Sequence, residues 1–404
     1  MKFGIIGSGI VGLTIAFEIS NQDPHFEITI FDKEDSSLKH GTGRNSGVIH
    51  SGIYYTPNSL RSKLCIEGSR LMKNFIKEHN LYLNPCGKLL MPRNKNEIDS
   101  LNLLFDRSKK VGVQAIKLNS KEEILNIEPN CNPLFDEALF IKDTAIGDPK
   151  EVSAKLLELL NKKKVSIMYN HEVSEVNSEK GKIFVKNQIF EFDYIINAAG
   201  LYSDKIAKVS NLKTNYSSLP FKGKYWEVET SMSSELPKTL LYPVPNLDHP
   251  FLGIHTVYDK KGKFYLGPSS TPVFGKEAYK FFQNFNLIEF VSLFFKFMIK
   301  IIKNENKLRS LAINEFRNLF LSHIKKSTKL YFKSSLNISL SKSAKVGIRS
   351  QIFDNQSNTL FNDFVVINQN KTIHILNAIS PAWTSSFAMA KYICSNFLKL
   401  SNRP

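Results

Sequence analysis

Residues 3–20 read FGIIGSGIVGLTIAFEIS, and this stretch decides the fold. The apolar run FGIIG is typical of a buried strand in a parallel sheet, and the residues after it predict a tight turn that opens into a helix. Three glycines form the pattern G-x-G-x-x-G, which permits the turn, lets the backbone approach a pyrophosphate and lets the helix pack close to the strand. The helix N-terminus attracts that anion. The predicted dinucleotide-binding residues here are Gly7, Gly9, Ile10, Val11 and Gly12.

The next strand supports a dinucleotide site. FEITIFDKE alternates like a strand and ends at Asp32, twenty residues past Gly12. A carboxylate there accepts hydrogen bonds from ribose hydroxyls and disfavours a 2′-phosphate, so FAD or NAD is expected rather than NADP. If the glycines only made a turn, Asp32 would have no role. We assign Asp32 and its neighbour Lys33 to the cofactor.

A polar segment favours FAD over NAD. Residues 41–59 read GTGRNSGVIHSGIYYTPNS, with no helix or strand period, and a helix-like run, 59–79, follows. A loop rich in Gly, Ser and Asn can wrap a diphosphate and a ribityl chain with backbone N–H groups and hydroxyls. Arg44, Asn45 and Ser46 are therefore predicted to contact a flavin cofactor.

Two later segments are predicted to return to the same cofactor. EFDYIINAAGLYSD, 191–204, is an apolar strand ending in small residues, and the chain before it reads as an amphipathic helix followed by a strand. TIHILNAISPAWTSSFAMAKYICSNFL, 372–398, is a strand followed by a long helix, whose N-terminal dipole could face the flavin. The cofactor residues predicted from these segments are Val173, Ala199, Gly200, Asn377, Pro381 and Ala382.

Cofactor-binding segments at the start, middle and end predict an interleaved α/β fold. A Rossmann-like FAD-binding domain takes residues 1–85, 145–215 and 341–404, and an antiparallel-sheet substrate domain takes 86–144 and 216–340. Within the second domain, residues 280–328 read as a helical insertion. Its run LIEFVSLFFKFMIKIIK carries lysines and is too short and charged to span a membrane. It is interpreted as a helix packed on the domain or, alternatively, as a basic apolar face on an anionic membrane, where a quinone could collect electrons.

Five motifs resemble one known group: GSGIVGL, GRNSGVIHSGIYYTPNSLRSKLC, NAAGLYSD, LLYPVPNLDHPFLGIH and HILNAISPAWTSS. The chain is similar to the L-2-hydroxyglutarate oxidases and dehydrogenases, a branch of the D-amino-acid-oxidase-like flavoproteins. The resemblance implies non-covalent FAD, a two-domain fold and oxidation of an L-2-hydroxy acid, with L-2-hydroxyglutarate as the leading substrate. Asp32 stands where this group commonly has glutamate. Trp383 stands where it usually has a small residue, which bears on the size of the substrate pocket.

Oxidation of a hydroxy acid by a flavin requires a base for the hydroxyl proton and a cation for the carboxylate. His50 and His255 are the candidate bases, and the sequence does not rank them; His374 faces either the core or the flavin. Arg349 is the candidate carboxylate ligand, against the alternative of a surface ion pair. Tyr54 is a candidate hydrogen-bond donor, against plain packing. Further candidates are Lys222, Lys224, Tyr55 and Tyr225, whereas His25 and His40 are expected at the surface.

Composition limits the remaining possibilities. The chain has 404 residues, 42% of them hydrophobic, and a net charge of +17. This charge is better explained by a compositional bias, an anionic ligand or contact with a membrane surface than by binding of nucleic acid. Four scattered cysteines and the absence of a signal peptide predict reduced thiols in a cytoplasmic protein, with no metal. The electron acceptor, a quinone or O₂, stays open. Alternatives to hydroxy-acid oxidation are a flavoenzyme acting on an amino acid, a secondary amine or glycerol 3-phosphate, and a non-catalytic FAD-binding module.

Overall fold

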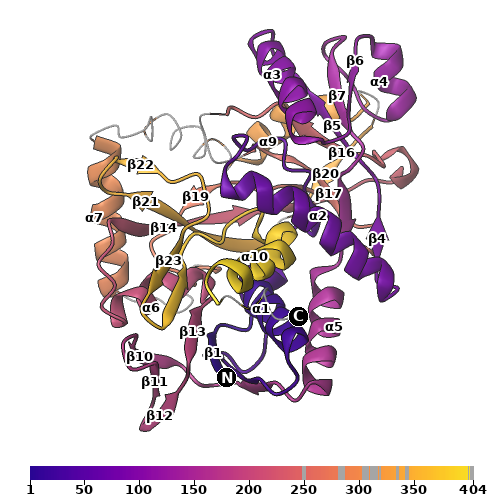
Figure 1. Ribbon diagram of the computed structural model, residues 1–404. Coiled ribbons are helices and arrows are strands. Elements are labelled where there is room, and N and C mark those ends of the chain that lie inside the picture. The colour runs from indigo at the N-terminus through magenta and orange to yellow at the C-terminus, as the bar shows by residue number, and fades with distance from the viewer. Residues whose placement is uncertain are drawn as a thin grey trace.

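The computed structural model describes residues 1–247, 252–280, 287–302, 309, 317, 320–333, 336–341, 345–398 and 400. The predicted helical insertion at 280–328 therefore lies partly outside the described residues. Figure 1 shows two halves, with helices gathered around a sheet near the N-terminus and further sheets above it.

A six-stranded sheet forms the centre of the first half. Its order is β23-β24-β13-β1-β2-β9, and all neighbours pair in parallel except β23 and β24. The chain thus contributes strands from its beginning, middle and end, as the predicted fold class requires. The bounds are β1 (Lys2–Ile6), β2 (Glu27–Phe31), β9 (Ser166–Met168), β13 (Tyr194–Asn197), β23 (Val366–Gln369) and β24 (Thr372–Ile375).

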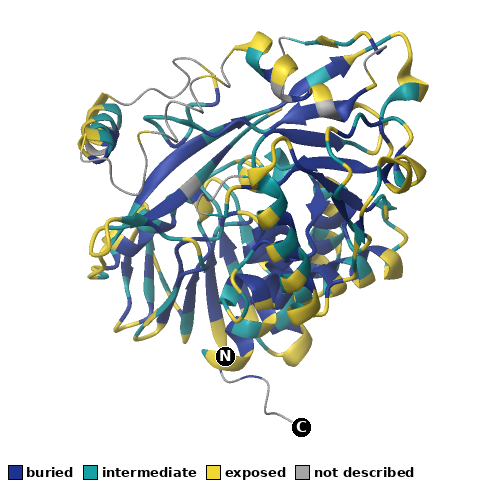
Figure 2. Ribbon diagram, turned by 90° about the horizontal axis from the view of Figure 1, so that it is seen from above, coloured by how far each residue is buried: buried dark blue, intermediate teal, exposed yellow. Residues whose placement is uncertain are grey.

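Both faces of this sheet are covered, which explains why β1 is an unbroken apolar run. Ile5 packs with helices on one face, and Ile6 packs with a small three-stranded sheet on the other. Figure 2 shows the buried strands inside and the exposed positions around them. The covering elements are α1 (Ile10–Gln22), α2 (Leu60–Glu78), α5 (Pro149–Lys162), α6 (Ser203–Val209), α10 (Ala382–Asn396), β10 (Val173–Asn177), β11 (Lys182–Val185) and β12 (Gln188–Glu191).

Strands of the second half form three four-stranded sheets, ordered β19-β14-β21-β22, β17-β18-β15-β20 and β16-β5-β7-β6. Pairing is antiparallel, as predicted, except between β5 and β16, which run parallel and come from separate passages of the chain. The strands are β5 (Lys88–Met91), β6 (Ala115–Leu118), β7 (Ala138–Ile141), β14 (Tyr216–Lys224), β15 (Trp226–Glu229), β16 (Leu240–Pro243), β17 (His255–Tyr258), β18 (Phe264–Gly267), β19 (Thr271–Pro272), β20 (Ser339–Leu340), β21 (Val346–Asp354) and β22 (Thr359–Leu360).

Smaller elements complete the described chain. A short sheet ordered β3-β8-β4 lies beside the first half, and α7 lies at the edge of the molecule next to β21 and β22 (Figure 1). The domain limits proposed from the sequence stay predictions. The remaining bounds are β3 (Val48–Ile49), β4 (Leu83–Asn84), β8 (Ala145–Gly147), α3 (Asn96–Val111), α4 (Lys121–Ile127), α7 (Leu287–Ile302) and α9 (Leu321–Ser327), with short 3-10 turns η1 (Gly41–Arg44), η2 (Gly200–Tyr202), η3 (Ser233–Glu235) and η5 (Lys329–Tyr331).

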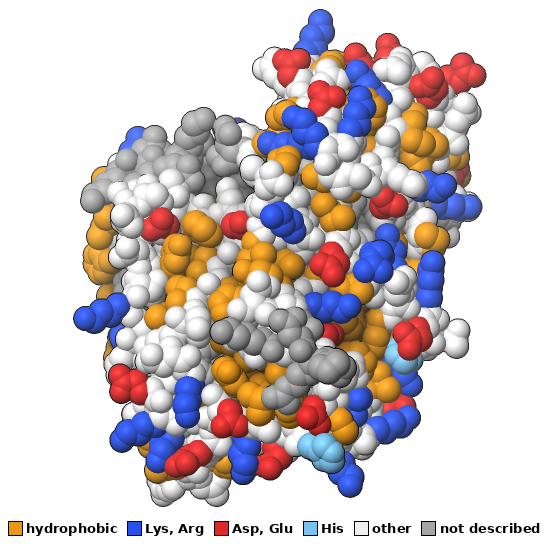
Figure 3. Space-filling model, viewed as in Figure 1, with side chains coloured by type: hydrophobic (Ala, Val, Ile, Leu, Met, Phe, Trp, Pro, Cys, Tyr) orange, Lys and Arg blue, Asp and Glu red, His pale blue; other side chains and the backbone are white. Residues whose placement is uncertain are grey.

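One face of the molecule carries its charged side chains in a dispersed form (Figure 3). On the face shown in Figure 3, Lys and Arg side chains alternate with Asp and Glu. Among the described residues, no helix is long and apolar enough to cross a membrane.

Candidate active site

A cavity of about 440 Å³ lies where the two halves meet. Its wall combines the first turn of α1, the loop after β2, the end of β13, the loop before α10 and residues of β17 and β21. The predicted cofactor residues that line it are Gly7, Gly9, Ile10, Val11, Asp32, Lys33, Arg44, Asn45, Ser46, Val173, Ala199, Gly200, Pro381 and Ala382.

The glycine turn leaves no room for side chains. Gly7 has φ +106°, and a Cβ there would lie 2.6 Å from the carbonyl oxygen of Ala198 on the neighbouring strand end. A Cβ at Gly12 would lie 2.0 Å from the carbonyl oxygen of Gly7, so Gly12 acts behind the cavity, by packing the helix on the turn. The first N–H group of α1, on Ile10, donates to Thr42 Oγ1 at 2.9 Å. This cradle fits a pyrophosphate at the start of α1.

Asp32 holds the turn in place. Its Oδ2 accepts hydrogen bonds from the backbone N–H of Ser8 at 2.8 Å and from the Ser8 hydroxyl at 2.6 Å. Its Oδ1 accepts from the backbone N–H of Glu34 at 3.0 Å. The carboxylate is therefore fixed at the cavity wall, where it fits a ribose.

The polar loop after β2 folds against α1 and β21. It contains the turn η1 and the strand β3, where the sequence predicted no regular element. The Asn45 amide donates to Thr42 O at 2.8 Å, and Asn45 Oδ1 accepts from Gly47 N at 2.7 Å. The Arg44 guanidinium stacks on the ring of Tyr279, 3.9 Å from its centroid. The loop therefore has a defined conformation and forms part of the cavity wall, although its sequence shows neither a helix nor a strand period.

The N-terminus of α10 ends at the cavity. Pro381, Ala382 and Trp383 line it, and no side chain caps this end of the helix. Trp383 is buried, and its indole N–H has no hydrogen-bond partner within the described chain. The positive end of the helix dipole therefore faces the space where a flavin fits.

Four predicted catalytic residues line the same cavity: His50, Tyr54, His255 and Arg349. His255 Nδ1 lies 2.9 Å from the carbonyl oxygen of Gly253. Because a carbonyl only accepts, Nδ1 carries the hydrogen, and Nε2 of the neutral ring is free of a proton. Burial lowers the pKa of His255 to about 3, so the ring is neutral at physiological pH. Arg349 Nη2 donates to Ser270 Oγ at 2.8 Å.

His50 has a similar environment. Its backbone N–H donates to Thr384 Oγ1 at 3.0 Å, which ties the loop to α10. The ring nitrogen Nδ1 is buried without a hydrogen-bond partner in the described parts of the chain. Burial lowers the pKa of His50 well below its usual value, and nearby cations add to this effect.

Besides Gly12, two predicted site residues lie outside the cavity wall. His374 is fully buried in β24; its Nδ1 accepts from the Asn197 amide at 3.1 Å, and its Nε2 donates to Gln369 Oε1 at 3.1 Å. These hydrogen bonds place His374 in the core, which is one of the two alternatives that the sequence left open. Asn377 accepts from Ile352 N at 3.1 Å and donates to Asp363 O at 2.7 Å, so it joins chain segments rather than contacting a ligand.

Lysines on β14 also differ from expectation. Lys222 and Lys224 do not contribute to the wall of this cavity, whereas the nearby Tyr55 and Tyr225 do. Arg61 on α2 and Arg107 on α3 also line the wall, and neither was predicted from the sequence. Arg107 Nη1 donates to the carbonyl oxygen of Tyr54 at 3.1 Å. Arg61 lies within the motif GRNSGVIHSGIYYTPNSLRSKLC, where nothing sets it apart as a site residue, and Arg107 belongs to none of the quoted motifs. Only the packing of their helices reveals them.

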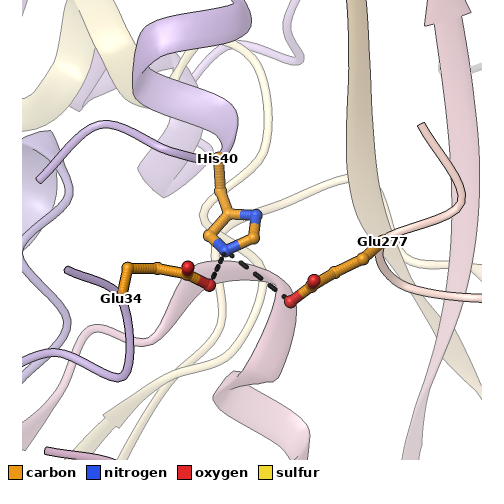
Figure 4. A group of neighbouring side chains, drawn as sticks. All are labelled: Glu34, His40 and Glu277. Carbon is orange, nitrogen blue, oxygen red and sulfur yellow. Dashed lines mark hydrogen bonds and ion pairs between the residues drawn. The ribbon is translucent and has the colours of Figure 1, made fainter. Parts of the chain in front are cut away.

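An ionic cluster links the loop after β2 to residues 276–279, and His40 belongs to it instead of lying free at the surface. His40 Nε2 lies 2.8 Å from Glu34 Oε1 and 3.7 Å from Glu277 Oε1, as Figure 4 shows. The Lys33 ammonium pairs with both carboxylates, and the Tyr202 hydroxyl donates to Glu277. Although one His and two Glu have metal-ligating atoms, Lys33 already offsets their charge. We therefore interpret this cluster, Glu34–His40–Glu277 with Lys33, as a cross-link between segments.

The model of the FAD-dependent oxidoreductase family known as DAO matches residues 2–395. The chain belongs to this family. It is an oxidoreductase whose cofactor is FAD, and the glycine turn, Asp32 and the α10 N-terminus described above fit that cofactor.

Similar proteins cover the chain almost completely. It is 33% identical to the L-2-hydroxyglutarate dehydrogenase of Indibacter alkaliphilus over 98% of both chains. It is also 33% identical to the mitochondrial L-2-hydroxyglutarate dehydrogenase of Bos taurus, over 96% of this chain and 87% of the relative. These identities agree with the resemblance found in the motifs.

Solved structures agree on the fold. The FAD-bound L-alpha-glycerophosphate oxidase from Mycoplasma pneumoniae superposes with a TM-score of 0.73 at 22% identity, over 100% of this chain and 95% of the other. The L-proline dehydrogenase from P. horikoshii gives a TM-score of 0.72 at 14% identity, over 98% and 93%. These oxidases and dehydrogenases share the D-amino-acid-oxidase-like architecture predicted from the sequence.

Proposed function

We propose that this enzyme oxidises an L-2-hydroxy acid to a 2-oxo acid, with L-2-hydroxyglutarate as its substrate. The observation that carries the proposal is the meeting of two neutral imidazoles and one guanidinium, from His50, His255 and Arg349, in the wall of one cavity. The relatives named above, called L-2-hydroxyglutarate dehydrogenases, support the choice of substrate.

Each residue has a distinct task in this proposal. Arg349 binds a carboxylate of the substrate, a role that suits its planar fork of donors. One of the two imidazoles accepts the hydroxyl proton, as a general base must. FAD, when bound, supplies the hydride acceptor. The hydrogen bond from Nδ1 of His255 to Gly253 O leaves Nε2 of that ring to accept the proton. In His50, Nδ1 has no partner within the described chain and can contact a ligand.

The proposal is tested by mixing the purified, FAD-loaded protein with candidate substrates under anaerobic conditions. We expect L-2-hydroxyglutarate to bleach the flavin absorbance, and D-2-hydroxyglutarate to do so far more slowly. Sarcosine, L-proline and glycerol 3-phosphate are the comparison substrates, since they represent the other chemistries of this fold. Bleaching by one of these, with L-2-hydroxyglutarate inert, would overturn the substrate assignment.

We further propose that α7 brings the enzyme to an anionic membrane surface, where a quinone collects the electrons. The helix exposes a stripe of large apolar side chains: Ile288, Val291, Phe295, Ile299 and Ile302, with exposed fractions between 42% and 83%. The spacing of three or four residues places them on one face. An apolar face on a protein of net charge +17 is suited to anionic lipid.

A further inference from the structure

Lys88 on β5 is fully buried, and the proposed chemistry gives it no task. Its ammonium nitrogen lies 4.2 Å from the centroid of the Tyr54 ring and 5.2 Å from that of Tyr242. Within the described chain this nitrogen has no hydrogen-bond partner. Burial of a cation without an anion is costly, so such a group points to a functional role.

Aromatic rings connect Lys88 to the active site. Tyr54 lines the cavity together with His50 and His255. Tyr242 stacks on the His255 ring with their centroids 3.8 Å apart and their planes 15° from parallel. Lys88 itself is not part of the cavity wall, so its ammonium lies behind one layer of rings. At this depth it acts on the imidazoles through its charge, without touching a ligand.

In the part of the chain that the structure describes, the charged side chains that act on the two imidazoles, Lys88, Arg61 and Arg349, are all positive. Burial is the main cause of the lowered pKa of His50, followed by Lys88 and, more weakly, His255 and Arg61. For His255, burial lowers the pKa, and Lys88 and Arg349 add to this against the opposing hydrogen bond to Gly253. A positive charge beside an imidazole disfavours its protonation.

The other titratable groups near Lys88 are neutral. Cys65 on α2 has its pKa raised by burial to about 12, so the thiol carries no charge at physiological pH. Burial likewise raises the pKa of Tyr54 and of Tyr242 well above the usual value. Burial lowers the pKa of Lys88 to about 7, which lies above that of His255.

We propose that Lys88 is a positioning residue that keeps His50 and His255 in their proton-accepting form as the pH falls. The lysine takes up a proton near neutrality, before the imidazoles do, and its charge then opposes a proton on either ring. The consequence for catalysis rests on the proposed function, whereas the effect on the imidazoles does not.

The direct test is a titration of the histidine rings by NMR in the FAD-loaded protein with labelled histidine. His50 and His255 signals are assigned with H50N and H255N. In Lys88→Met, both rings are expected to protonate about one pH unit higher than in the parent enzyme. The control is Lys73→Met, which removes a partly buried lysine of α2 that does not act on either ring and leaves both titrations unchanged. Unchanged titrations in Lys88→Met with full flavin content would overturn the proposal.

Activity provides a second test. The acidic limb of the kcat/KM profile for L-2-hydroxyglutarate is expected to move up by about one pH unit in Lys88→Met, roughly a tenfold loss on that limb. Above pH 8 the two enzymes are expected to agree, because Lys88 is then neutral. Lys88→Gln replaces Lys88→Met if the latter fails to retain FAD. A parent enzyme inactive on L-2-hydroxyglutarate would refute the proposed function, and the ring titration would still decide the role of Lys88.

Discussion

Asp32 does two things at the residue scale, because its carboxylate fixes the Ser8 turn and also lines the cavity. Replacing Asp32 with Ala is expected to weaken FAD binding by roughly 10- to 100-fold, since a hydrogen bond to a charged group contributes about 1.5–3 kcal/mol. Flavin fluorescence titration measures the affinity. Asp35→Ala, with an exposed side chain in the same loop, is the control and should bind FAD normally. Equal affinity of the two variants would contradict this role.

The candidate bases are distinguished by single variants. His50→Asn and His255→Asn each keep a polar side chain of similar size but lose the proton-accepting ring nitrogen. The variant that lacks the base is expected to lose roughly 10²- to 10⁴-fold in kcat, which is the usual contribution of general base catalysis. Single-turnover bleaching of the flavin reports this step, and flavin content serves as the control for folding. If both variants keep the kcat of the parent, neither ring is the base.

The sequence predicted those site residues that a local motif encodes. Gly7, Gly9 and Asp32 were found because turn, helix and strand lie next to one another in the chain. Lys88 was missed, because its position depends on the pairing of β5 with β16, far along the chain. For His374 the sequence left core and flavin open, because alternation along a strand does not tell which face of a sheet meets the cofactor.

At the scale of elements, the packing of α1 on its turn is the most sensitive contact. Gly12→Ala places a methyl group against the backbone oxygen of Gly7, which cannot rotate away as a side chain would. The variant is expected to lose about 1–3 kcal/mol in the free energy of unfolding. Denaturant titration measures this. Gly41→Ala, where a Cβ meets no atom within 4 Å, is the control and should change little. A stable Gly12→Ala protein would show that α1 can shift.

The exposed stripe of α7 leads to a prediction about membranes. Phe295→Glu and Ile299→Glu place a negative charge on the apolar face and are expected to reduce co-sedimentation with phosphatidylglycerol vesicles at least tenfold. Leu103→Glu on α3, where the parent side chain is 46% exposed, is the matched control. Absence of binding by the parent protein would refute the membrane proposal. The sequence predicted the helix here, but an apolar stripe at helical spacing does not tell whether it packs against the protein or faces solvent.

At the scale of the whole molecule, the Glu34–His40–Glu277 cluster with Lys33 joins the first segment to residues that lie far along the chain. Lys33, Glu34, His40 and Tyr202 line the cavity, so the cross-link closes one part of its wall. Glu277→Ala is expected to speed the release of FAD roughly tenfold, since it removes hydrogen bonds to a half-buried charge. Stopped-flow fluorescence measures the release. Glu235→Ala, on the exposed turn η3, is the control. An unchanged release rate would show that the cluster does not retain the cofactor.

The interleaved architecture was predictable because each return to the cofactor has its own strand and small-residue signature. The pairing of strands from different segments was not predictable, since hydrophobic patterns do not say which strand lies beside which. The parallel contact of β5 with β16 and the contact of η1 with β21 are both of this kind.

The order of strands in the six-stranded sheet has a consequence for biosynthesis. Because β24 lies beside β13, with β23 beyond it, a nascent chain on the ribosome leaves one edge of β13 unpaired until residues 366–375 have been translated. Capture of FAD must wait longer still, since the start of α10 follows these strands and lines the cavity, and a chaperone that shields the incomplete sheet would raise the yield of holoenzyme.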